Sequence, residues 1–414
     1  MNRRHLLAAP LFGLTAAKGS TSTPSLPDAS LRTQAPDKYW NRIREEQFTL
    51  PDWRAFLNNG SLGVSPKPVV AAVTGFLENA AAWMTDGYPR WGYETLDDER
   101  AEMAAFLGCK RDELAFTHNA TEALSMIAAG LDLKPGDEVL MTNWEHPSGK
   151  APWQRRAQRD GVTIREVAIP LPAKSAGQLA ELMVSAIGPK TKVLSFSGIL
   201  SSPGIIMPVK EICTAARAKG VITVVDGAHM NGQIPVNLAD LNCDYYAGSP
   251  HKWMFAPAGC GILYIREENL DRLWPTIVTG DFDRKELKAA RFMKVGTNSK
   301  AIMVGMMAGL KFIKALGAAN IYERIHSMAK LNREMARKRP YIDVLSSDDD
   351  SLFGSLIYIG FQRRDQKKAS ELISKKRIWV HVANEVRIST HIHTRPQDLE
   401  LYYSTLDEAF GHKA

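Results

Sequence analysis

Cysteine is scarce in this chain of 414 residues, and the few that occur follow no metal-ligand spacing. The four are Cys109, Cys213, Cys243 and Cys260, and no cysteine follows Cys260. Two of them, Cys213 and Cys243, lie in strongly apolar surroundings, so we expect most of the four to be reduced core residues. An oxidising compartment would permit a disulfide, but the sequence does not pair them. No metal site is expected.

The sequence also lacks a basic tract with interleaved aromatic residues and a long apolar run. Its formal net charge of +7 comes from 52 basic and 45 acidic residues spread along the chain, which is typical of a solvated surface. We therefore expect neither nucleic acid as a partner nor a permanent membrane span. With 45% hydrophobic and 23% charged residues, the composition favours an ordinary soluble enzyme with one large core and a smaller appended domain.

The first 36 residues have the layout of a bacterial export signal and linker. Asn2-Arg3-Arg4-His5-Leu6-Leu7 precedes a short apolar stretch that ends at Ala17, and a run rich in Ser, Thr, Pro and Ala continues to Pro36. The adjacent arginines and the two leucines resemble the twin-arginine signal, which carries folded proteins across the inner membrane. We expect the twin-arginine translocation machinery as a partner and the periplasm as the location. The alternative is a cytoplasmic enzyme with an accidental basic, apolar start.

Short apolar runs alternate with helix-period segments through the middle of the chain, which predicts an α/β fold. Several runs lack polar alternation, as is typical of strands buried on both faces of a mainly parallel sheet. Seven strands are predicted, at 113–117, 138–142, 163–167, 193–197, 222–226, 245–249 and 261–265. Helices are predicted between them at 121–131, 177–187 and 209–219.

The chain is expected to divide into four parts. Residues 1–36 would be the signal and linker, 37–60 an N-terminal segment that joins the small domain, 61–318 a large cofactor-binding domain, and 319–414 a small C-terminal α/β domain. Strands of the small domain are predicted at 355–361, 378–382 and 385–389. A helix-length apolar passage after Ser299 leads out of the large domain, and we expect its methionines to fill the core.

An aspartate and a lysine follow two successive predicted strands. Asp226 ends one strand and Lys252 comes shortly after the next, so both belong to the sheet edge where ligands of such folds bind. Together they suit pyridoxal phosphate (PLP). The aspartate would keep the ring nitrogen protonated, and the lysine would form a Schiff base and later move protons. A structural ion pair is the alternative interpretation of the two residues alone.

Other polar groups recur at the same edge. The segment 116–123 runs from a strand straight into a helix, so the amides of Ala120 to Glu122 should form an anion site, with Thr121 as the helix cap. Ser249 and His251 flank the lysine and can donate to the same phosphate.

Three further residues suit ring stacking and substrate binding. His146 follows the strand at 138–142 and could stack on a pyridine ring, although a lone histidine there would more often be a surface or core group. Arg387 lies between apolar residues in a predicted strand, where its guanidinium fork could hold a substrate carboxylate with two hydrogen bonds. Asn59 lies in a turn-rich loop and could assist, or could be a turn asparagine.

These motifs together resemble class V aminotransferases, which are PLP enzymes of fold type I. Within that class the sequence is most similar to the isopenicillin N epimerase-like and cysteine desulfurase-like branch, and the export signal is similar to that of periplasmic pyoverdine-tailoring members. The resemblance covers about residues 40–410 and implies a large domain with a mainly parallel seven-stranded sheet plus a smaller C-terminal α/β domain. The matching segments, in family order, are Asn119-Ala120-Thr121-Glu122, Glu145-His146, Asp226-Gly227-Ala228-His229, Ser249-x-His251-Lys252, Gly296-Thr297 and Val386-Arg387-Ile388-Ser389.

The resemblance implies a role for each matched residue. Lys252 would carry the cofactor, Asp226 would pair with its ring nitrogen, and His146 would stack on the ring. Thr297 would reach the phosphate of the other subunit of a homodimer. His229 would lie near the phenolic oxygen or the phosphate. The residues implied to surround the phosphate are Ala120, Thr121, Ser249 and His251.

Two departures from the family narrow the predicted reaction. Cysteine desulfurases need a nucleophilic cysteine shortly before the carboxylate-binding arginine, and this chain has none after Cys260. Ser201 stands where desulfurases usually place an asparagine beside the phenolic oxygen, which would leave room for a different substrate or a water. A desulfurase is therefore disfavoured.

The sequence predicts a PLP-dependent enzyme that acts on a small-molecule or peptide-borne amino acid. Aminotransferase-type tailoring chemistry in the periplasm ranks first. Epimerisation, C–S or β-elimination and oxidative decarboxylation are alternatives, because all of them use the same residues. A degenerate, cofactor-free scaffold is the alternative that is not an enzyme. The substrate and the reaction type are left open.

Overall fold

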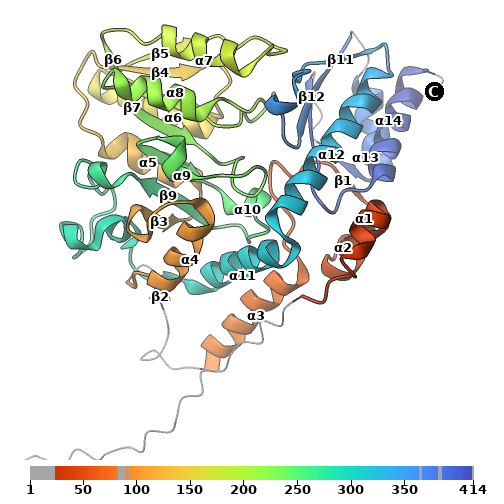
Figure 1. Ribbon diagram of the computed structural model, residues 1–414, viewed down its shortest axis with the longest axis horizontal. Coiled ribbons are helices and arrows are strands. Elements are labelled where there is room, and N and C mark those ends of the chain that lie inside the picture. The colour runs from red at the N-terminus through yellow and green to blue at the C-terminus, as the bar shows by residue number, and fades with distance from the viewer. Residues whose placement is uncertain (1–23, 83–89, 92, 363–365, 381–384, 413–414) are drawn as a thin grey trace, which may run out of the picture.

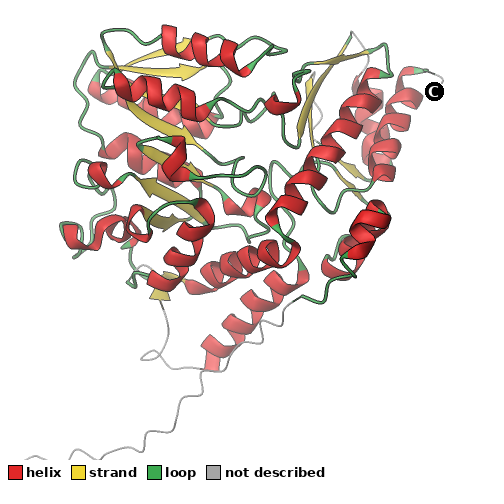
Figure 2. Cartoon of the chain, in the orientation of Figure 1, coloured by secondary structure: helices red, strands yellow, loops and turns green. Residues whose placement is uncertain are grey.

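The computed structural model describes residues 24–82, 90–91, 93–362, 366–380 and 385–412 (Figure 1). The predicted twin-arginine motif lies outside these residues. The described chain forms a large part built on a seven-stranded sheet and a smaller part that contains the C-terminus (Figure 2).

All seven predicted strands of the large sheet are present, with boundaries within two residues of the prediction. The sheet order is β3-β9-β8-β7-β6-β4-β5. Strand β9 is antiparallel to both of its neighbours and every other pairing is parallel, which confirms the mainly parallel sheet. The strands are β3 (Leu114–Thr117), β4 (Glu138–Thr142), β5 (Thr163–Val167), β6 (Thr191–Ser197), β7 (Ile222–Asp226), β8 (Tyr245–Gly248) and β9 (Gly261–Ile265).

Helices cover both faces of this sheet (Figure 1). Helix α5 (Ala120–Gly130) packs against α6 (Pro147–Asp160), while α8 (Val209–Ala218) packs against α7 (Ala176–Ser185) and α9 (Leu238–Leu241). Their apolar sides and the inward residues of the strands form one large core. The sheet is therefore sealed from water on both faces, and only its strand ends are open for ligands.

The cap of α5 differs from the prediction. Asn119, with an extended backbone, is the capping residue, and its side-chain oxygen accepts a hydrogen bond of 2.9 Å from the amide of Glu122. Thr121 was the predicted cap, and this was wrong, because Thr121 already lies inside the helix. A capping side chain must precede the first helical residue to reach the free amides of the first turn.

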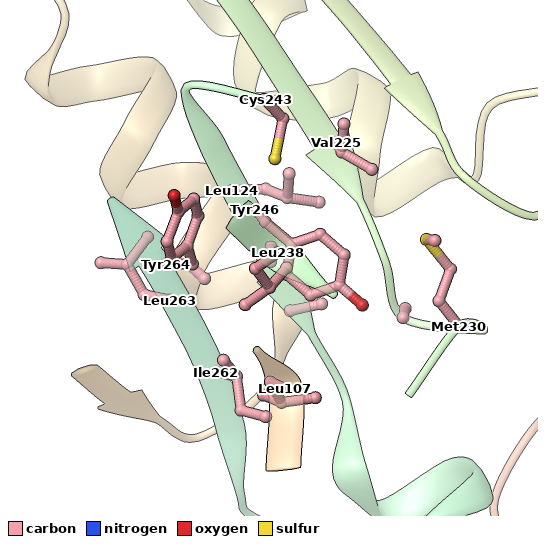
Figure 3. Close-up of a cluster of buried hydrophobic side chains, with 14 of the residues drawn as sticks. Leu107, Leu124, Val225, Met230, Leu238, Cys243, Tyr246, Ile262, Leu263 and Tyr264 are labelled. Atoms are coloured by element: carbon pink, nitrogen blue, oxygen red, sulfur yellow. The ribbon is translucent and has the colours of Figure 1, made fainter. Parts of the chain in front are cut away.

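Part of the large core surrounds Tyr246 of β8 (Figure 3). Leu124, Val225 and Tyr246 are buried there, and the Tyr246 ring lies so close to Gly227 that a Cβ at this position would overlap it. The Tyr246 hydroxyl also donates to the Gly227 carbonyl at 3.2 Å. Gly227 therefore allows the chain to turn between Asp226 and His229 without losing this packing.

The smaller part has its own hydrophobic core. Its antiparallel sheet has the order β11-β12-β14. The elements of this part are β11 (Ile342–Val344), β12 (Leu356–Phe361), β14 (Glu385–Ser389), α12 (Ala318–Arg337), α13 (Gln366–Lys375) and α14 (Pro396–Phe410).

The N-terminal segment lies against this smaller part (Figure 1). Strand β1 (Ala55–Phe56) pairs in parallel with β13 (Ile378–Trp379). The predicted strand at 378–382 is thus shorter than expected over the described residues, and residues 381–384 lie outside them. Helices α1 (Ser30–Gln34) and α2 (Pro36–Gln47) precede β1, and Arg44 of α2 donates to the His393 carbonyl at 2.8 Å.

Two long helices connect the parts. Helix α3 (Lys67–Ala82) packs along α11 (Lys300–Leu316), whose Met303, Met306 and Met307 are buried as predicted. Among the described residues no single helix is long and apolar enough to cross a membrane, and α11 bends by 84° into α12. The remaining elements are α4 (Asp97–Leu107), α10 (Pro250–Trp253), β2 (Arg90–Trp91), β10 (Asn298–Ser299) and the 3-10 turns Arg111–Glu113, Glu267–Asn269, Lys285–Met293 and Asp350–Leu352.

Candidate active site

A cavity opens where the carboxyl ends of the large sheet's strands face the smaller part. Strands β3, β4, β6, β7 and β8 all run toward this edge, because β9 reverses direction between β8 and β3. The predicted site residues that line the cavity are Ala120, Thr121, His146, Ser201, Asp226, His229, Ser249, His251, Lys252 and Arg387.

Lys252 projects into the cavity from the short helix α10, directly after β8. Burial lowers the pKa of its amine to about 8, and the nearby carboxylate of Asp226 works in the opposite direction. The amine is 3.1 Å from Nε2 of His229. With this pKa, about one-tenth of the amines are neutral at pH 7, and the neutral form is the nucleophile.

The loop before α3 contacts the backbone of Lys252 and fixes its position. Its carbonyl accepts a hydrogen bond of 2.8 Å from the side-chain amide of Asn59, and Gly63 approaches so closely that a Cβ there would overlap the same carbonyl. The Gly63 amide donates to the His251 carbonyl at 2.9 Å. The loop before α3 therefore sets the position of the lysine, and glycine is needed at position 63 for this approach.

Asp226 occupies the end of β7, beside Ser197 of β6. Its carboxyl accepts a hydrogen bond of 2.9 Å from the amide of Ala228, while burial raises its pKa. The positive charges of Lys252 and His146 lower the pKa again. An acid in such a place gains most from a cationic partner, which a protonated ring nitrogen would supply.

An anion site lies at the N-terminus of α5. The Ala120 amide points to the hydroxyl of Ser249 at 3.1 Å, and Thr121 borders the same space. His251 lies within 3.1 Å of the Cys260 carbonyl through Nδ1. Because a carbonyl only accepts, Nδ1 carries a proton, and Nε2 of His251 can donate to a phosphate only when the ring is fully protonated.

His146 is exposed at the rim of the cavity and caps α6. Its Nδ1 accepts from the Ser148 amide at 3.1 Å, and burial of part of the ring lowers its pKa. The preceding Glu145 binds the hydroxyls of Thr142 and Ser197 at 2.6 Å each. Burial raises the Glu145 pKa to about 7 despite these two donors.

Arg387 reaches the cavity from β14 of the smaller part. Its guanidinium donates to the Ser201 carbonyl at 2.8 Å, to the Asn58 side chain at 3.2 Å and to the Ser61 hydroxyl at 2.8 Å. The buried Nε has no hydrogen-bond partner among the described residues. Because this Nε is buried as well as unpartnered, an acceptor such as a carboxylate could reach it only if the guanidinium moved.

Two predicted site residues lie elsewhere. Asn59 is fully buried and does not line the cavity: it lies between the Lys252 carbonyl and His393, whose Nε2 is 3.3 Å from its side-chain oxygen. It supports the lysine and does not face the substrate space, so its predicted substrate contact is corrected. Thr297 is exposed and does not line the cavity of its own chain, and its predicted action on a partner subunit stays a prediction.

Sequence reasoning missed three residues at the site. Asn58 and Ser61 hold Arg387, and Trp253 donates to His229. The first two belong to the Asn58-Asn59-Gly60-Ser61 loop, where the choice between neighbouring asparagines depends on which side chain turns outward. Trp253 directly follows the lysine, and this adjacency was the available clue.

The described residues contain no cluster of three His, Cys, Asp or Glu side chains that could hold a metal ion. All four cysteines are free thiols. Cys213, Cys243 and Cys260 are buried, and burial raises the pKa of each thiol.

Residues 56–396 match the family described as Aminotransferase class-V. The chain belongs to this family. Two proteins of similar sequence are isopenicillin N epimerases. The protein from Streptomyces clavuligerus is 29% identical over 86% of this chain and 94% of its own length. The protein from Amycolatopsis lactamdurans is 33% identical over 71% and 78%. A probable cysteine desulfurase from Pyrococcus abyssi is 28% identical over 67% and 72%.

Solved structures share the class V fold. An apo cysteine desulfurase from Thermococcus onnurineus has a TM-score of 0.79 and 24% identity, covering 89% of this chain and 97% of that one. A cystine C-S lyase in complex with cysteine persulfide has a TM-score of 0.76 and 24% identity, covering 85% and 97%. A variant of that lyase holds glycine covalently linked to PLP.

Pyridoxal 5'-phosphate is the cofactor of this class V protein, and the cavity fits it. A partly buried acid, Asp226, lies at one side for the ring nitrogen. The N-terminus of α5, together with the hydroxyls of Thr121 and Ser249 beside it, suits a phosphate. A lysine with a lowered pKa projects into the space between them. The chemistry of the donor set therefore matches the three polar ends of the cofactor.

Proposed function

We propose that this protein processes amino-acid substrates with PLP attached at Lys252, most specifically by aminotransferase-type tailoring of a free or peptide-borne amino acid. The observation that supports it best is that Arg387 lines the same cavity as Lys252 and Asp226. A carboxylate on Arg387 would place the substrate amine toward Lys252.

Each chain residue has a defined task in this proposal. Arg387 binds and orients the substrate carboxylate, and Lys252, once free, holds and moves the proton at Cα. Asp226 keeps its negative charge and so holds a proton on the ring nitrogen. The bound cofactor supplies an electron-withdrawing ring that stabilises negative charge at Cα.

Epimerisation is the second candidate, because the two isopenicillin N epimerases match most of this chain at 29% and 33% identity. Sulfur transfer to an enzyme cysteine is disfavoured by the lack of any cysteine after Cys260. Lyase chemistry and oxidative decarboxylation use the same residues and stay alternatives.

A product screen in heavy water separates these reactions. Purified protein with PLP is supplied with amino acids and short peptides, with and without a keto-acid acceptor. A new keto acid with amino transfer to the acceptor supports the aminotransferase proposal. Cα deuterium with inverted configuration and no keto acid identifies an epimerase, and released sulfide or ammonia identifies a lyase. A protein that binds PLP but gives none of these products contradicts the proposal.

We also propose export of the folded protein to the periplasm by the twin-arginine machinery, on the strength of the Arg3-Arg4 motif. Cells that express the wild type or the R3K/R4K double variant are fractionated. We expect the wild type in the periplasm and the double variant in the cytoplasm. Equal periplasmic delivery of both would contradict the twin-arginine route.

A homodimer is the proposed assembly, with Thr297 acting at the partner's phosphate site. Exposed apolar side chains support a surface that a second subunit covers. They are Val70 and Leu77 on α3, and Trp274 and Val278 in the segment before Thr297. Sedimentation at micromolar concentration should give twice the chain mass. T297A should weaken PLP binding without changing that mass, and a monomer with full PLP affinity would contradict the proposal.

A further inference from the structure

A row of three polar groups leads from the cavity into the core, because Lys252 and His229 line the cavity and Trp253 lies beyond them. The indole Nε1 of Trp253 donates to Nδ1 of His229 at 3.2 Å, and Nε2 of His229 is 3.1 Å from the Lys252 amine. Trp253 is fully buried, and His229 is only 3% exposed. No water-filled path is needed to connect these groups, because each contacts the next directly.

The chemistry of the indole decides where the His229 proton lies. An indole N–H only donates, so His229 Nδ1 must be the unprotonated, accepting nitrogen. Burial lowers the His229 pKa well below its ordinary value, so the ring is neutral and its single proton is on Nε2. The Nε2–H then donates to Lys252. An ammonium has no lone pair to accept this hydrogen bond, whereas a neutral amine does.

We propose that Trp253 is a positioning residue that fixes the His229 proton on Nε2, and that this N–H holds the free Lys252 amine in its neutral, nucleophilic form. The inference rests on the proposed function, in which Lys252 carries the cofactor. Trp253 acts only through His229 and does not border the cavity.

Trp253 is itself fixed by the segment that follows β14. Its ring stacks on His391, with ring centres 5.7 Å apart and planes 19° apart, and its carbonyl lies 3.2 Å from Nε2 of His391. Nδ1 of His391 accepts from the Ile392 amide at 2.8 Å, so Nε2 carries the proton and donates to Trp253. The ring stacking and the backbone hydrogen bond to the same histidine hold Trp253 in place, which limits rotation of its N–H away from His229.

Four other titratable groups face Lys252. Asp226 on β7 favours the ammonium form, while Arg387 on β14 disfavours it. His146 before α6 and His251 on α10 also interact with the lysine charge. None of the four is substituted in the variants below, so a change in the Lys252 titration midpoint is attributed to the contact between Trp253 and His229.

The test measures Lys252 in the full-length chain after removal of PLP. Trace acetic anhydride labels neutral amines at a series of pH values, and mass spectrometry quantifies the peptide that carries Lys252. For the wild type we expect a midpoint near pH 8. W253F removes the N–H but keeps the aromatic ring, so the His229 Nε2 becomes free to accept from an ammonium. We expect the midpoint to rise by about one pH unit, or roughly a tenfold slower labelling near pH 7.

Two variants control this experiment. W153F removes another fully buried indole N–H, which donates to Ser195 at 3.0 Å, and should leave the Lys252 midpoint unchanged. H229Q keeps an acceptor for Trp253 and a donor for Lys252, and should retain a midpoint near that of the wild type. A W253F midpoint equal to that of the wild type, in folded protein, would overturn the proposal.

Nitrogen-15 NMR of the histidine rings provides a test that needs no variant. At about pH 9, above the expected Lys252 midpoint, the wild-type His229 should show the neutral ring with the proton on Nε2, and a proton on Nδ1 or a doubly protonated ring would overturn the proposal. Both measurements use protein without PLP. A failure of the proposed function would instead appear as absent PLP binding, so the two failures are distinguishable.

Discussion

The two walls of the cavity are built in different ways. The cofactor wall, made of Ala120, Asp226 and Lys252, is set by strand ends of the large sheet, each within a few residues of β3, β7 or β8. The substrate wall, which comprises Arg387 with Asn58, Ser61 and Ser201, is held by side-chain hydrogen bonds.

Both walls join residues that are far apart in the sequence: the Asn59–Lys252 and Ala120–Ser249 hydrogen bonds span 193 and 129 positions. The contacts of Arg387 join residues 186, 329 and 326 positions apart. The backbone of the sheet contributes little to them. We therefore expect the large sheet to determine cofactor binding, and substrate choice to depend on Arg387 of β14 and the residues that hold its side chain. The predictions below test this division.

The largest expected effect comes from the cofactor wall. D226N removes the charge that should pair with the ring nitrogen. The loss of one partner of a buried ion pair costs about 4 kcal/mol, so turnover should fall roughly 1000-fold for every substrate. PLP absorbance should persist, because Lys252 is intact. Steady-state kinetics and absorbance of the same preparation check this.

Asp244 provides the matched control for that variant. It is a buried carboxylate under the same sheet, bound to the amide and hydroxyl of Thr223 at 2.8 Å each, and it does not line the cavity. D244N should lower the melting temperature and leave turnover per folded molecule near that of the wild type. Equal kinetic losses in D226N and D244N would contradict the assignment of Asp226.

A smaller and selective effect is expected at the substrate wall. R387K keeps the positive charge but loses the paired N–H donors of the guanidinium, at a cost of about 3 kcal/mol. The kcat/KM for substrates with a free carboxylate should therefore fall roughly 100-fold. Amines that lack the carboxylate should lose nothing. The absorbance of bound PLP should not change. An equal loss of kcat/KM for both substrate classes would show that Arg387 does not bind the substrate carboxylate.

Gly60 contacts both walls and should give an intermediate result. A Cβ at this position would lie 3.3 Å from Arg387 Cζ and 3.3 Å from His229 Cε1. G60A should displace the guanidinium slightly and raise KM about tenfold, which corresponds to about 1.4 kcal/mol of overpacking. PLP affinity should change much less than KM. G75A, at a glycine with open space around the added methyl, is the control.

The smallest effect concerns pH. Burial raises the Glu145 pKa to about 7, so the folded protein keeps a proton that the unfolded chain loses above about 4.5. Folding stability should therefore fall as the pH rises from about 4.5 to about 7. E145Q removes this contribution and should flatten the melting temperature over that window.

E138Q controls for the loss of a glutamate, because Glu138 begins β4 and Glu145 follows the end of that strand. Arg165 lowers the Glu138 pKa, so its contribution to stability is lost only as the pH falls through that lowered value. In E138Q the melting temperature should still fall as the pH rises from about 4.5 to about 7. If the melting temperature of E145Q depends on pH as it does in the wild type, Glu145 is already ionised in the folded protein.

The same division explains what the sequence could predict. Apolar runs located every strand of the large sheet, and residues next to strand ends, such as Asp226 and Lys252, could be assigned to one edge. Side-chain direction inside a loop leaves no such pattern. Asn59 was therefore predicted to help bind the substrate, whereas Asn58 is the asparagine that contacts Arg387. Thr121 was predicted to cap α5, whereas Asn119 is the capping residue. The Trp253 contact with His229 depends on tertiary packing that periodicity does not encode.

The central claim is that Lys252 is the residue to which PLP attaches. Full-length protein with PLP is reduced with borohydride, digested and mapped by mass spectrometry. Lys294, a buried lysine that contacts Asp281 outside the cavity, serves as an internal control. The account predicts a visible absorbance band before reduction, a pyridoxyl group on the Lys252 peptide alone, and neither in K252A. An unmodified Lys252 at saturating PLP, or a label on other lysines instead, would contradict it.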